Sequence, residues 1–303
     1  MLLGSILDAV GNTPLIQLSR LASETGCDIL LKLEMVNPAG GHKARIALSM
    51  IRAAERTGEL IPGSGQTIIE PTGGNTGMGI VMAAAVLGYR VVLVIPDNYS
   101  REKQRLLSAL GAEIVLSDSR RGNDSHGELA QQILLEHPEY VLLNQGANPA
   151  NPQAHRDGTA PEILRDLDGR RIDHVVAGIG TGGHVTGVGE VLKESFPWLL
   201  VHGVQPAGCD LFAEKFSYHR IQGLSIGYIP PALDTEVLND MITVSEEEAS
   251  EGMRLLMRTE GIAAGISTGA NIAAALRVAR EAVTRQTILT FAYDSAQDYL
   301  DLT

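Results

Sequence analysis

Short apolar runs of strand length alternate with helix-length segments through most of this 303-residue sequence. The expected strands cover residues 28–33, 66–70, 90–95, 113–116, 140–143, 175–177, 200–204, 241–244 and 286–293. The expected helices cover residues 43–57, 75–87, 100–110, 127–136, 188–195 and 270–282. Strands joined through helices pair in parallel, because each crossover returns the chain to the same end of the sheet. The pattern therefore predicts an α/β fold with mostly parallel sheets.

The size of the chain predicts two domains. With 303 residues, of which 44% are hydrophobic, a soluble globular protein can bury a substantial core. Residues 66–143 are expected to form a compact βαβαβαβ unit. The proline- and asparagine-rich segment at 148–152 follows it and is typical of a crossing between domains.

Charge and cysteine usage exclude several kinds of partner. Acidic residues outnumber basic ones by 36 to 24, giving a formal net charge of -12, so no nucleic-acid partner is expected. Cys27 and Cys209 stand far apart without other residues at metal-ligand spacing, which indicates reduced thiols, a cytoplasmic location and no metal site. The N-terminus lacks a basic segment and the most apolar stretch is interrupted, so neither a signal peptide nor a membrane partner is expected.

A glycine-rich stretch at residues 178–187 directly follows one of the expected strands. The backbone N–H groups of such a strand-to-helix turn converge and suit a phosphate group. The same pattern also occurs where a helix only packs closely on a sheet. The stretch alone favours neither interpretation, so the other motifs have to decide.

Lys43 is the first candidate for chemistry. It stands in the expected first turn of a helix, where a cation is unfavourable against the helix dipole, and it follows a Pro-Ala-Gly-Gly turn that would let it point inward. Burial there would lower its pKa and make its amine a usable nucleophile. An exposed lysine at a helix start is the alternative. The neighbouring His42 is interpreted as a packing or surface residue.

A second turn offers backbone donors to an anion, and a third loop opens a helix. Residues 71–77 add two hydroxyls and one amide, and would hold a carboxylate. Residues 265–269 open the last expected helix. Each turn alone is also compatible with an ordinary helix cap. Two anion-binding turns and an oddly placed lysine in one chain are harder to explain by capping and packing alone.

Six short motifs occur in order along the chain. They are Gly-Asn-Thr-Pro-Leu at 11–15, Asn-Pro-Ala-Gly-x-x-Lys ending at Lys43, Glu-Pro-Thr-x-Gly-Asn-Thr-Gly at 70–77, Asn-Pro-Ala-Asn-Pro at 148–152, Gly-Thr-Gly-Gly at 180–183 and Gly-Ile-Ser at 265–267. This series resembles the cysteine synthase (O-acetylserine sulfhydrylase) and cystathionine β-synthase family over nearly the whole chain. The resemblance implies a homodimeric pyridoxal 5'-phosphate enzyme that acts on small amino acids.

The resemblance also implies a fold and a set of functional residues. The fold is the two-domain, fold type II architecture of tryptophan synthase β, with a smaller substrate domain at 40–146, a larger domain of 1–39 plus 147–303, and the cofactor in the cleft between them. The implied cofactor residues are Lys43, Asn75, Gly180, Thr181, Gly182, Gly183, His184 and Ser267. The implied substrate residues are Thr72, Gly73, Gly74, Thr76, Gln145, Gly223 and Ser225.

The implied reaction is β-replacement on an activated L-serine such as O-acetylserine, through an aminoacrylate intermediate. Lys43 would be the Schiff-base lysine and general base, Asn75 would bind the 3-oxygen of the cofactor, and Ser267 would face its pyridine nitrogen. Cysteine synthase is the default assignment. The alternatives are replacement by an amine or another thiol in specialised metabolism, a serine or threonine dehydratase-like lyase, and a catalytically silent binder, against which Lys43 and Asn75 argue.

Several positions depart from the family pattern. Gly73 replaces a usual serine, Gly41 and His42 replace Ser-Val, and His184 replaces a threonine. The usual Gly-Ile-Gly-Ala-Gly loop reads Gly-Leu-Ser-Ile-Gly at 223–227, which introduces Ser225 and Ile226. We therefore expect the cofactor chemistry to be kept. The departures leave the identity of the leaving group and of the nucleophile unassigned. Arg120 and Arg121 are interpreted as a solvated surface pair.

Overall fold

The computed structural model describes residues 2–72, 74–122, 124–297 and 299. Its backbone contacts divide the chain into two compact units. The first comprises Met1–Val10 and Pro38–Asn151, and the second comprises Gly11–Asn37 and Pro152–Thr303. The domain limits expected from the sequence differ from this grouping at residues 1–10, 38–39 and 147–151, and as domains they stay a prediction.

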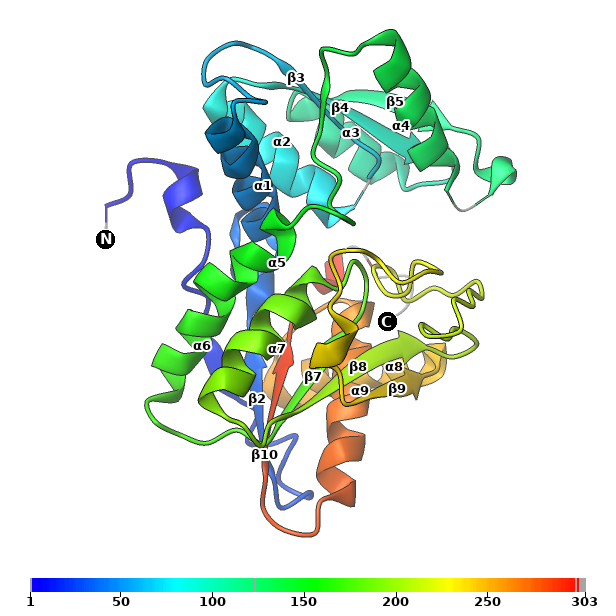
Figure 1. Ribbon diagram of the computed structural model, residues 1–303. Coiled ribbons are helices and arrows are strands. Elements are labelled where there is room, and N and C mark those ends of the chain that lie inside the picture. Colours follow the sequence, from blue (N-terminus) through cyan, green and yellow to red (C-terminus); the bar gives the residue numbers. More distant parts are fainter. Residues whose placement is uncertain (1, 73, 123, 298, 300–303) are drawn as a thin grey trace. The chain divides into compact units, whose positions relative to one another are not determined.

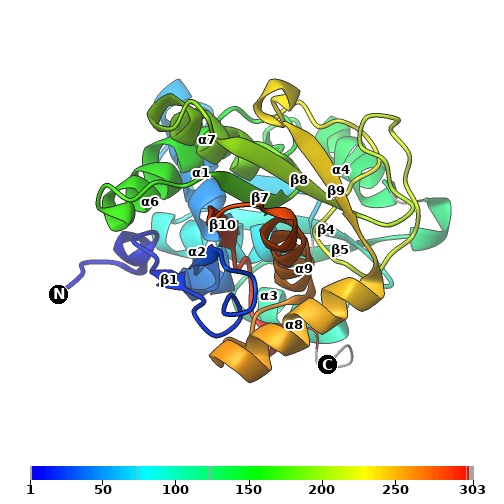
Figure 2. The ribbon, with the colours of Figure 1, turned by 90° about the horizontal axis from the view of Figure 1, so that it is seen from below.

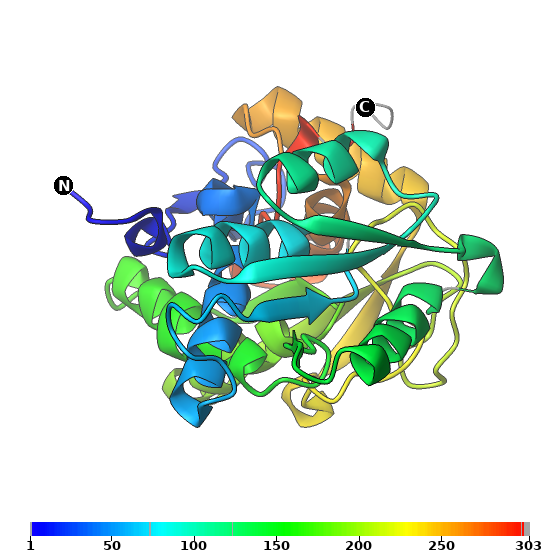
Figure 3. The ribbon, with the colours of Figure 1, turned by 90° about the horizontal axis from the view of Figure 1, so that it is seen from above.

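The first unit is built on a four-stranded parallel sheet with the order β5-β4-β3-β6. Its strands are β3 (Thr67–Glu70), β4 (Arg90–Pro96), β5 (Glu113–Ser117) and β6 (Val141–Leu142). Its helices are α1 (Lys43–Thr57), α2 (Asn75–Leu87), α3 (Arg101–Ala109) and α4 (Ser125–Glu136), with short 3-10 turns at Ile6–Ala9, Pro38–Gly40 and Ser119–Arg121. Helices line both faces of this sheet, as Figures 1 and 3 show.

Alternate strand residues of this sheet face different helices. Ile69, Val92 and Val94 form a buried cluster with Ala130 of α4. On the opposite face α2 comes so close to β4 that a Cβ added to Gly77 would lie 3.1 Å from a methyl group of Leu93. The small residues that the sequence shows in α2 are therefore required by close packing.

The same helix also fixes the start of α1. A Cβ added to Gly79 would lie 2.9 Å from the Cβ of Ala47 and 2.9 Å from the carbonyl oxygen of Lys43. Contacts this short leave no room for any side chain at position 79. The first turn of α1, which carries Lys43, is thus held against the middle of α2.

The second unit contains a six-stranded sheet with the order β1-β2-β10-β7-β8-β9. The strands are β1 (Leu15–Gln17), β2 (Asp28–Lys32), β7 (His174–Gly178), β8 (Leu200–Pro206), β9 (Asp240–Val244) and β10 (Thr287–Phe291). Only the edge strand β1 pairs antiparallel, and the other strands pair in parallel. The helices are α6 (Ala160–Leu167), α7 (Gly183–Ser195), α8 (Glu246–Glu260) and α9 (Ile266–Glu281), with 3-10 turns at Glu34–Val36 and Thr235–Val237.

Two hydrophobic clusters cover the two faces of this sheet. Ile29, Val176 and Ile288 point toward α8 and α9 and share one cluster with their apolar residues. Residues one position along, such as Leu30 and Val175, share the other cluster with α6 and α7. Figure 2 shows α9 and α8 on one side of the strands and α7 with α6 on the other. None of the described helices is both long and apolar enough to span a membrane.

The predicted α/β class with mostly parallel sheets is confirmed, but two helices begin four or five residues earlier than expected. α7 begins at Gly183 instead of residue 188, and α9 begins at Ile266 instead of residue 270. Both starts lie inside glycine-rich turns, where the usual signal of a capping side chain is missing. The sequence also missed the helical segment that joins α5 (Ala150–Ala154) through a π-turn at His155–Thr159 to α6.

We expect Gly79→Ala to destabilise the protein by roughly 1 kcal/mol, because overpacking costs about 1–3 kcal/mol and the better helix propensity of alanine returns about 1 kcal/mol. Chemical denaturation followed by circular dichroism measures this difference. Val86→Ala, at an exposed position of the same helix, is the control and should stay within about 0.5 kcal/mol of the wild type. A Gly79→Ala protein as stable as the wild type would show that α2 and α1 can separate without cost.

Candidate active site

Lys43 is the first residue of α1 in the first unit. The preceding turn at Pro38–Gly40 has left-handed backbone at Ala39 (φ 65°) and Gly40 (φ 80°), which turns the chain sharply into the helix. His42 occupies the N-cap and makes no side-chain cap bond. The side chain of Lys43 is partly buried, and this desolvation lowers the pKa of its amine to about 8, although the nearby Glu70 opposes the shift. A substantial fraction of this amine is therefore neutral near physiological pH.

Glu70 is a buried carboxyl group at the end of β3. Burial raises its pKa to about 7, and hydrogen bonds from backbone N–H groups together with the charge of Lys43 limit the rise. Two of these bonds come from the backbone N atoms of Asn144 and Gln145, at 2.9 and 3.0 Å. Glu70 thus fixes the loop that carries Gln145. In the sequence, Glu70 is noted only as part of the 70–77 motif. Its position at the end of an expected strand is the signal that could have identified it as a functional residue.

The turn between β3 and α2 is the predicted carboxylate site. α2 begins after Gly74, and no side chain caps this start. The hydroxyl of Thr76 donates to Oε1 of Gln145 at 2.6 Å, and the backbone N of Gly74 approaches the hydroxyl of Thr72 at 3.4 Å. The structure therefore brings together four of the predicted substrate residues. Asn75 is the first residue of α2, and Gly73 lies outside the described residues.

The glycine-rich turn after β7 lies in the second unit. Gly182 is the N-cap of α7 with φ 78°, and no side chain caps the helix. A Cβ on Gly182 would lie 2.3 Å from the Cβ of Leu233, and a Cβ on Gly180 would lie 2.3 Å from the carbonyl oxygen of Gly223. Close packing thus explains these glycines in part. It also leaves an uncapped helix start whose dipole suits an anion.

The predicted residues Gly223 and Ser225 lie beside this turn. The backbone N of Ser225 donates to the carbonyl oxygen of Ile179 at 2.7 Å, which ties the 223–227 loop to the glycine-rich turn. Ser225 has a left-handed backbone with φ 49°, a conformation that a serine adopts at a cost and a glycine adopts freely. The loop therefore keeps the backbone expected of a glycine while carrying a serine side chain.

The side chain of His184 turns into the core of the second unit. Its ring centre lies 4.3 Å from that of Phe291 and 5.3 Å from that of Tyr293, both in edge-to-face arrangement. Only 7% of the residue is exposed. Its backbone remains in the first turn of α7, as the prediction of a phosphate cradle requires, while the ring packs against the end of β10.

Ser267 lies in the first turn of α9 and is buried. The same turn is tied to the end of β10, because the hydroxyl of Thr268 accepts the backbone N of Tyr293 at 3.1 Å. Burial raises the pKa of Tyr293, so its phenol stays protonated and donates to the carbonyl oxygen of Gly178 at 3.4 Å. Tyr293 thereby links the predicted Ser267 turn with the start of the glycine-rich turn. Sequence reasoning missed it because the link joins residues far apart in the chain.

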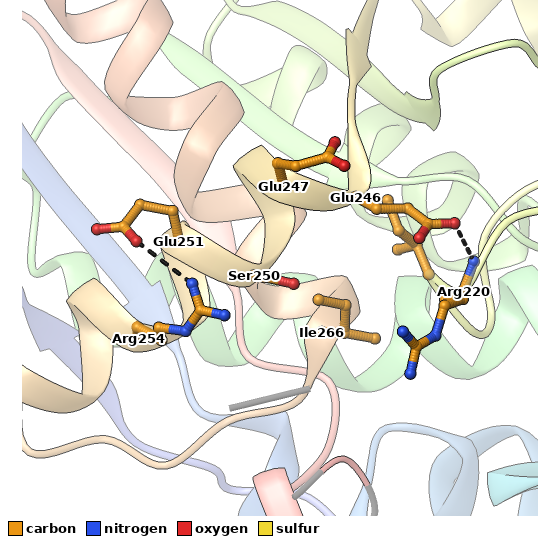
Figure 4. A pocket seen from close by; sticks show the side chains of 8 residues that line it. Arg220, Glu246, Glu247, Ser250, Glu251, Arg254 and Ile266 are labelled. Carbon is orange, nitrogen blue, oxygen red and sulfur yellow. Dashed lines mark hydrogen bonds and ion pairs between the residues drawn. The ribbon is translucent and has the colours of Figure 1, made fainter. Parts of the chain in front are cut away.

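Other charged features of the described residues do not involve the predicted site. A hollow of about 400 Å3 lies at the start of α8. Figure 4 shows the side chains that line it, where Glu246 accepts a hydrogen bond from the backbone N–H of Arg220 and Arg254 pairs with Glu251. Arg120 is exposed and paired with Asp118, and Arg121 is exposed as well. Within the part of the chain that the structure describes, no group of three or more His, Cys, Asp or Glu residues could hold a metal ion.

Comparisons with known proteins match almost the full chain. A family model described as pyridoxal-phosphate dependent enzyme matches residues 6–294. The cysteine synthase of Staphylococcus aureus is 39% identical over 297 residues, which cover 98% of this chain and 95% of that protein. The O-ureido-L-serine synthase of Streptomyces lavendulae is 41% identical over 300 residues, which cover 99% of this chain and 91% of that protein. A crystal structure of O-ureido-L-serine synthase matches with a TM-score of 0.95 at 40% identity, covering 99% of this chain and 94% of that one.

The lowered pKa of Lys43 is testable by chemical labelling. In protein without bound cofactor, acylation of Lys43 should rise with pH through a midpoint of about 8. Glu70→Gln should move this midpoint to lower pH, because it removes the negative charge that stabilises the protonated amine. Mass spectrometry of the labelled peptides gives both midpoints.

The exposed Lys215 serves as the internal control for this measurement. Its labelling should follow the same pH curve in the wild type and in Glu70→Gln. A midpoint of Lys43 that rises on removal of the Glu70 charge would contradict the assigned interaction.

Proposed function

The chain belongs to the family of pyridoxal-phosphate-dependent enzymes, and from that premise we propose that it replaces the β-substituent of an activated L-serine derivative. Its cofactor is pyridoxal 5'-phosphate. The observation that carries the proposal is the amine of Lys43, whose pKa is lowered to about 8 at the start of α1. An amine with such a pKa can serve as a nucleophile and as a general base near neutral pH.

The residues present fit the cofactor. The uncapped start of α7 after Gly182 suits its phosphate group. Lys43 supplies the amine that would bind its aldehyde carbon. We propose that Asn75 holds the ring oxygen and that Ser267, a neutral hydroxyl, faces the pyridine nitrogen. When bound, the cofactor withdraws electrons from the α-carbon of the substrate and so acidifies its α-proton.

The residues of the first unit would handle the substrate. The turn at 71–76 and the amide of Gln145 would hold the α-carboxylate, since an uncapped helix start and hydroxyl groups favour an anion. Because the carboxylate would be fixed, the α-proton of the substrate would have one orientation. Lys43 would remove that proton as a general base and return it after the nucleophile has added to the β-carbon.

The hydroxyl of Ser267 favours β-replacement over other reactions of this cofactor. A carboxylate beside the pyridine nitrogen would hold that nitrogen protonated and draw more charge into the ring. A buried serine, as found at the first turn of α9, provides no such charge. We therefore propose that the substrate loses its β-substituent after its α-proton has been removed.

The two main candidate reactions differ in the nucleophile that adds to the β-carbon. Cysteine synthase, with sulfide as nucleophile, is the default reaction. O-ureido-L-serine synthase is the alternative, because the relative of that name is about as similar as the relatives named cysteine synthase or probable cysteine synthase, at 41% against 39% and 42% identity. Ser225 supports an altered nucleophile, since this side chain is kept at a left-handed backbone position, where it costs about 1 kcal/mol relative to glycine. A lyase that releases the product without a nucleophile is the remaining candidate.

We further propose a cytoplasmic homodimer that acts on small amino acids. The net charge of -12 argues against nucleic acid as a partner. The two cysteines are unpaired and buried, which fits a reducing compartment. Light scattering coupled to size-exclusion chromatography tests the assembly, and a monomer at micromolar concentration would overturn it.

The decisive experiment is a matrix of substrates for the cofactor-loaded enzyme. O-acetylserine, O-phosphoserine and serine are each combined with sulfide, homocysteine, simple amines and hydroxyurea, whose oxygen would give an O-ureido product. If O-acetylserine with sulfide reaches a kcat/KM of at least about 10⁴ M⁻¹s⁻¹ and no other pair exceeds it, the enzyme is a cysteine synthase. Release of a keto acid without any nucleophile identifies the lyase. Turnover of none of the pairs would refute β-replacement.

Lys43→Ala should lose turnover while keeping the fold. We expect kcat to fall by at least about 10²-fold, the lower end of what a positioned general base contributes. After borohydride reduction, mass spectrometry should find the cofactor on the Lys43 peptide of the wild type and on no peptide of the variant. Lys215→Ala is the exposed control and should match the wild type. Covalent cofactor on a different lysine would show that Lys43 is not the attachment point.

A further inference from the structure

A tyrosine hydroxyl lies beside the turn that we propose for the substrate carboxylate. Tyr99 follows the end of β4, which pairs in parallel with β3 with Leu93 opposite Glu70. Because both strands end at the same edge of the sheet, the loop after β4 lies next to the loop after β3. A Cβ added to Gly74 would lie 3.2 Å from the hydroxyl oxygen of Tyr99. The phenol thus reaches the N-cap position of α2, which a larger residue at position 74 would crowd.

The fold holds Tyr99 in this place. Its backbone N donates to the carbonyl oxygen of Pro96 at 3.0 Å, and its own carbonyl oxygen accepts the side-chain amide of Gln104 at 3.0 Å. The next residue, Ser100, caps α3. The ammonium of Lys103 lies 6.0 Å from the ring centre on the same helix. The loop is therefore anchored on both sides of Tyr99, so the hydroxyl is positioned by the fold.

The chemistry of a phenol suits this location. A phenolic O–H can donate a hydrogen bond to a carboxylate, which has about four acceptor positions. The carboxylate loop of this chain lacks the serine usual in the family, because position 73 is glycine. One hydroxyl is thereby lost from the loop after β3. Tyr99 brings a hydroxyl to the same turn from the loop after β4.

We infer that Tyr99 is a substrate-binding residue whose hydroxyl hydrogen-bonds the α-carboxylate of the amino-acid substrate. It takes over the contact that the missing serine would make. This inference rests on the proposed function, since it deepens the assignment of the turn at 71–76 as the carboxylate site. It explains how an enzyme with glycine at position 73 still binds the α-carboxylate of an amino acid.

The test uses the cofactor-loaded enzyme and two probes. L-alanine has an α-carboxylate but no β-leaving group, and ethylamine is the same molecule without the carboxylate. Tyr99→Phe removes only the hydroxyl, so the Kd of L-alanine should rise by about ten- to a hundredfold, as expected for a lost hydrogen bond to a charged group. The Kd of ethylamine should stay unchanged. Isothermal titration calorimetry measures both, and the KM of the preferred serine derivative should rise while kcat changes by less than about threefold.

Two further variants separate a specific contact from a structural effect. Gly73→Ser in the Tyr99→Phe background returns a hydroxyl to the loop after β3 and should recover most of the lost affinity for L-alanine. Tyr89→Phe is the matched control: Tyr89 precedes β4 at the opposite end of the strand, and its hydroxyl bonds Glu55 at 2.9 Å. Its removal should leave the Kd of L-alanine at the wild-type value.

Three outcomes overturn the inference. The first is wild-type affinity of Tyr99→Phe for L-alanine, and the second is equal weakening for L-alanine and ethylamine, which would place the contact away from the carboxylate. In both cases the wild-type enzyme still binds L-alanine and carries its cofactor on Lys43, so the proposed function stands. The third is a wild-type, cofactor-loaded enzyme that binds no L-alanine, which overturns the proposed function together with the role of Tyr99.

Discussion

The proposed chemistry depends on hydrogen bonds that the backbone N–H groups at the starts of helices can donate. α2, α7 and α9 each begin after a glycine, at positions 74, 182 and 265, and none of the three has a capping side chain. α3 and α8, by contrast, begin at Ser100 and Ser245, whose hydroxyls accept the N–H group of the third residue beyond the cap. A glycine cap costs only about a few tenths of a kcal/mol relative to serine. For that small cost the first turns of α2 and α7 would remain available to the two anionic groups that we propose there, and the helix dipole would add to the attraction.

The reactive amine is held by a second constraint, the burial of two opposite charges in one unit. Desolvation lowers the pKa of Lys43 to about 8 and raises the pKa of Glu70 to about 7. Each shift disfavours the charged form, and the attraction between the two groups limits both. Glu70 also accepts two backbone N–H groups of the loop that carries Gln145. One carboxyl group thus shifts the pKa of the amine and positions the loop that carries Gln145, while Gly79 keeps the first turn of α1 in place.

The sequence predicted the α/β class and the limits of α1 and α2, because both helices end at glycines with left-handed backbone that are visible as stop signals. It placed the starts of α7 and α9 too late, since their glycine-rich first turns carry no capping side chain. The resemblance grouped the 71–77 turn with Gln145 around a substrate carboxylate, which stays a prediction; the structure joins the two by the hydrogen bond from Thr76 to Gln145. The links made by Tyr99 and Tyr293 were not predictable, because each joins loops that only strand order brings together.

Strand order also explains how such a site can change its substrate without changing its cofactor. The loops after β3 and β4 are neighbours, so a hydroxyl lost from one can be supplied by the other without moving the backbone of either. The carboxylate is common to every amino-acid substrate, and its contacts therefore fix binding without selecting a nucleophile. The 223–227 loop is different, because it is tied to the glycine-rich turn by the backbone bond from Ser225 to Ile179 and by the close approach of the Gly223 carbonyl to Gly180. Its side chains can vary while the backbone stays, and a serine kept at a left-handed position places a polar group there at a conformational cost. Under the proposed function, selection of the second substrate would therefore fall to side chains of this loop, whereas retention of the first would fall to the hydroxyl groups around α2.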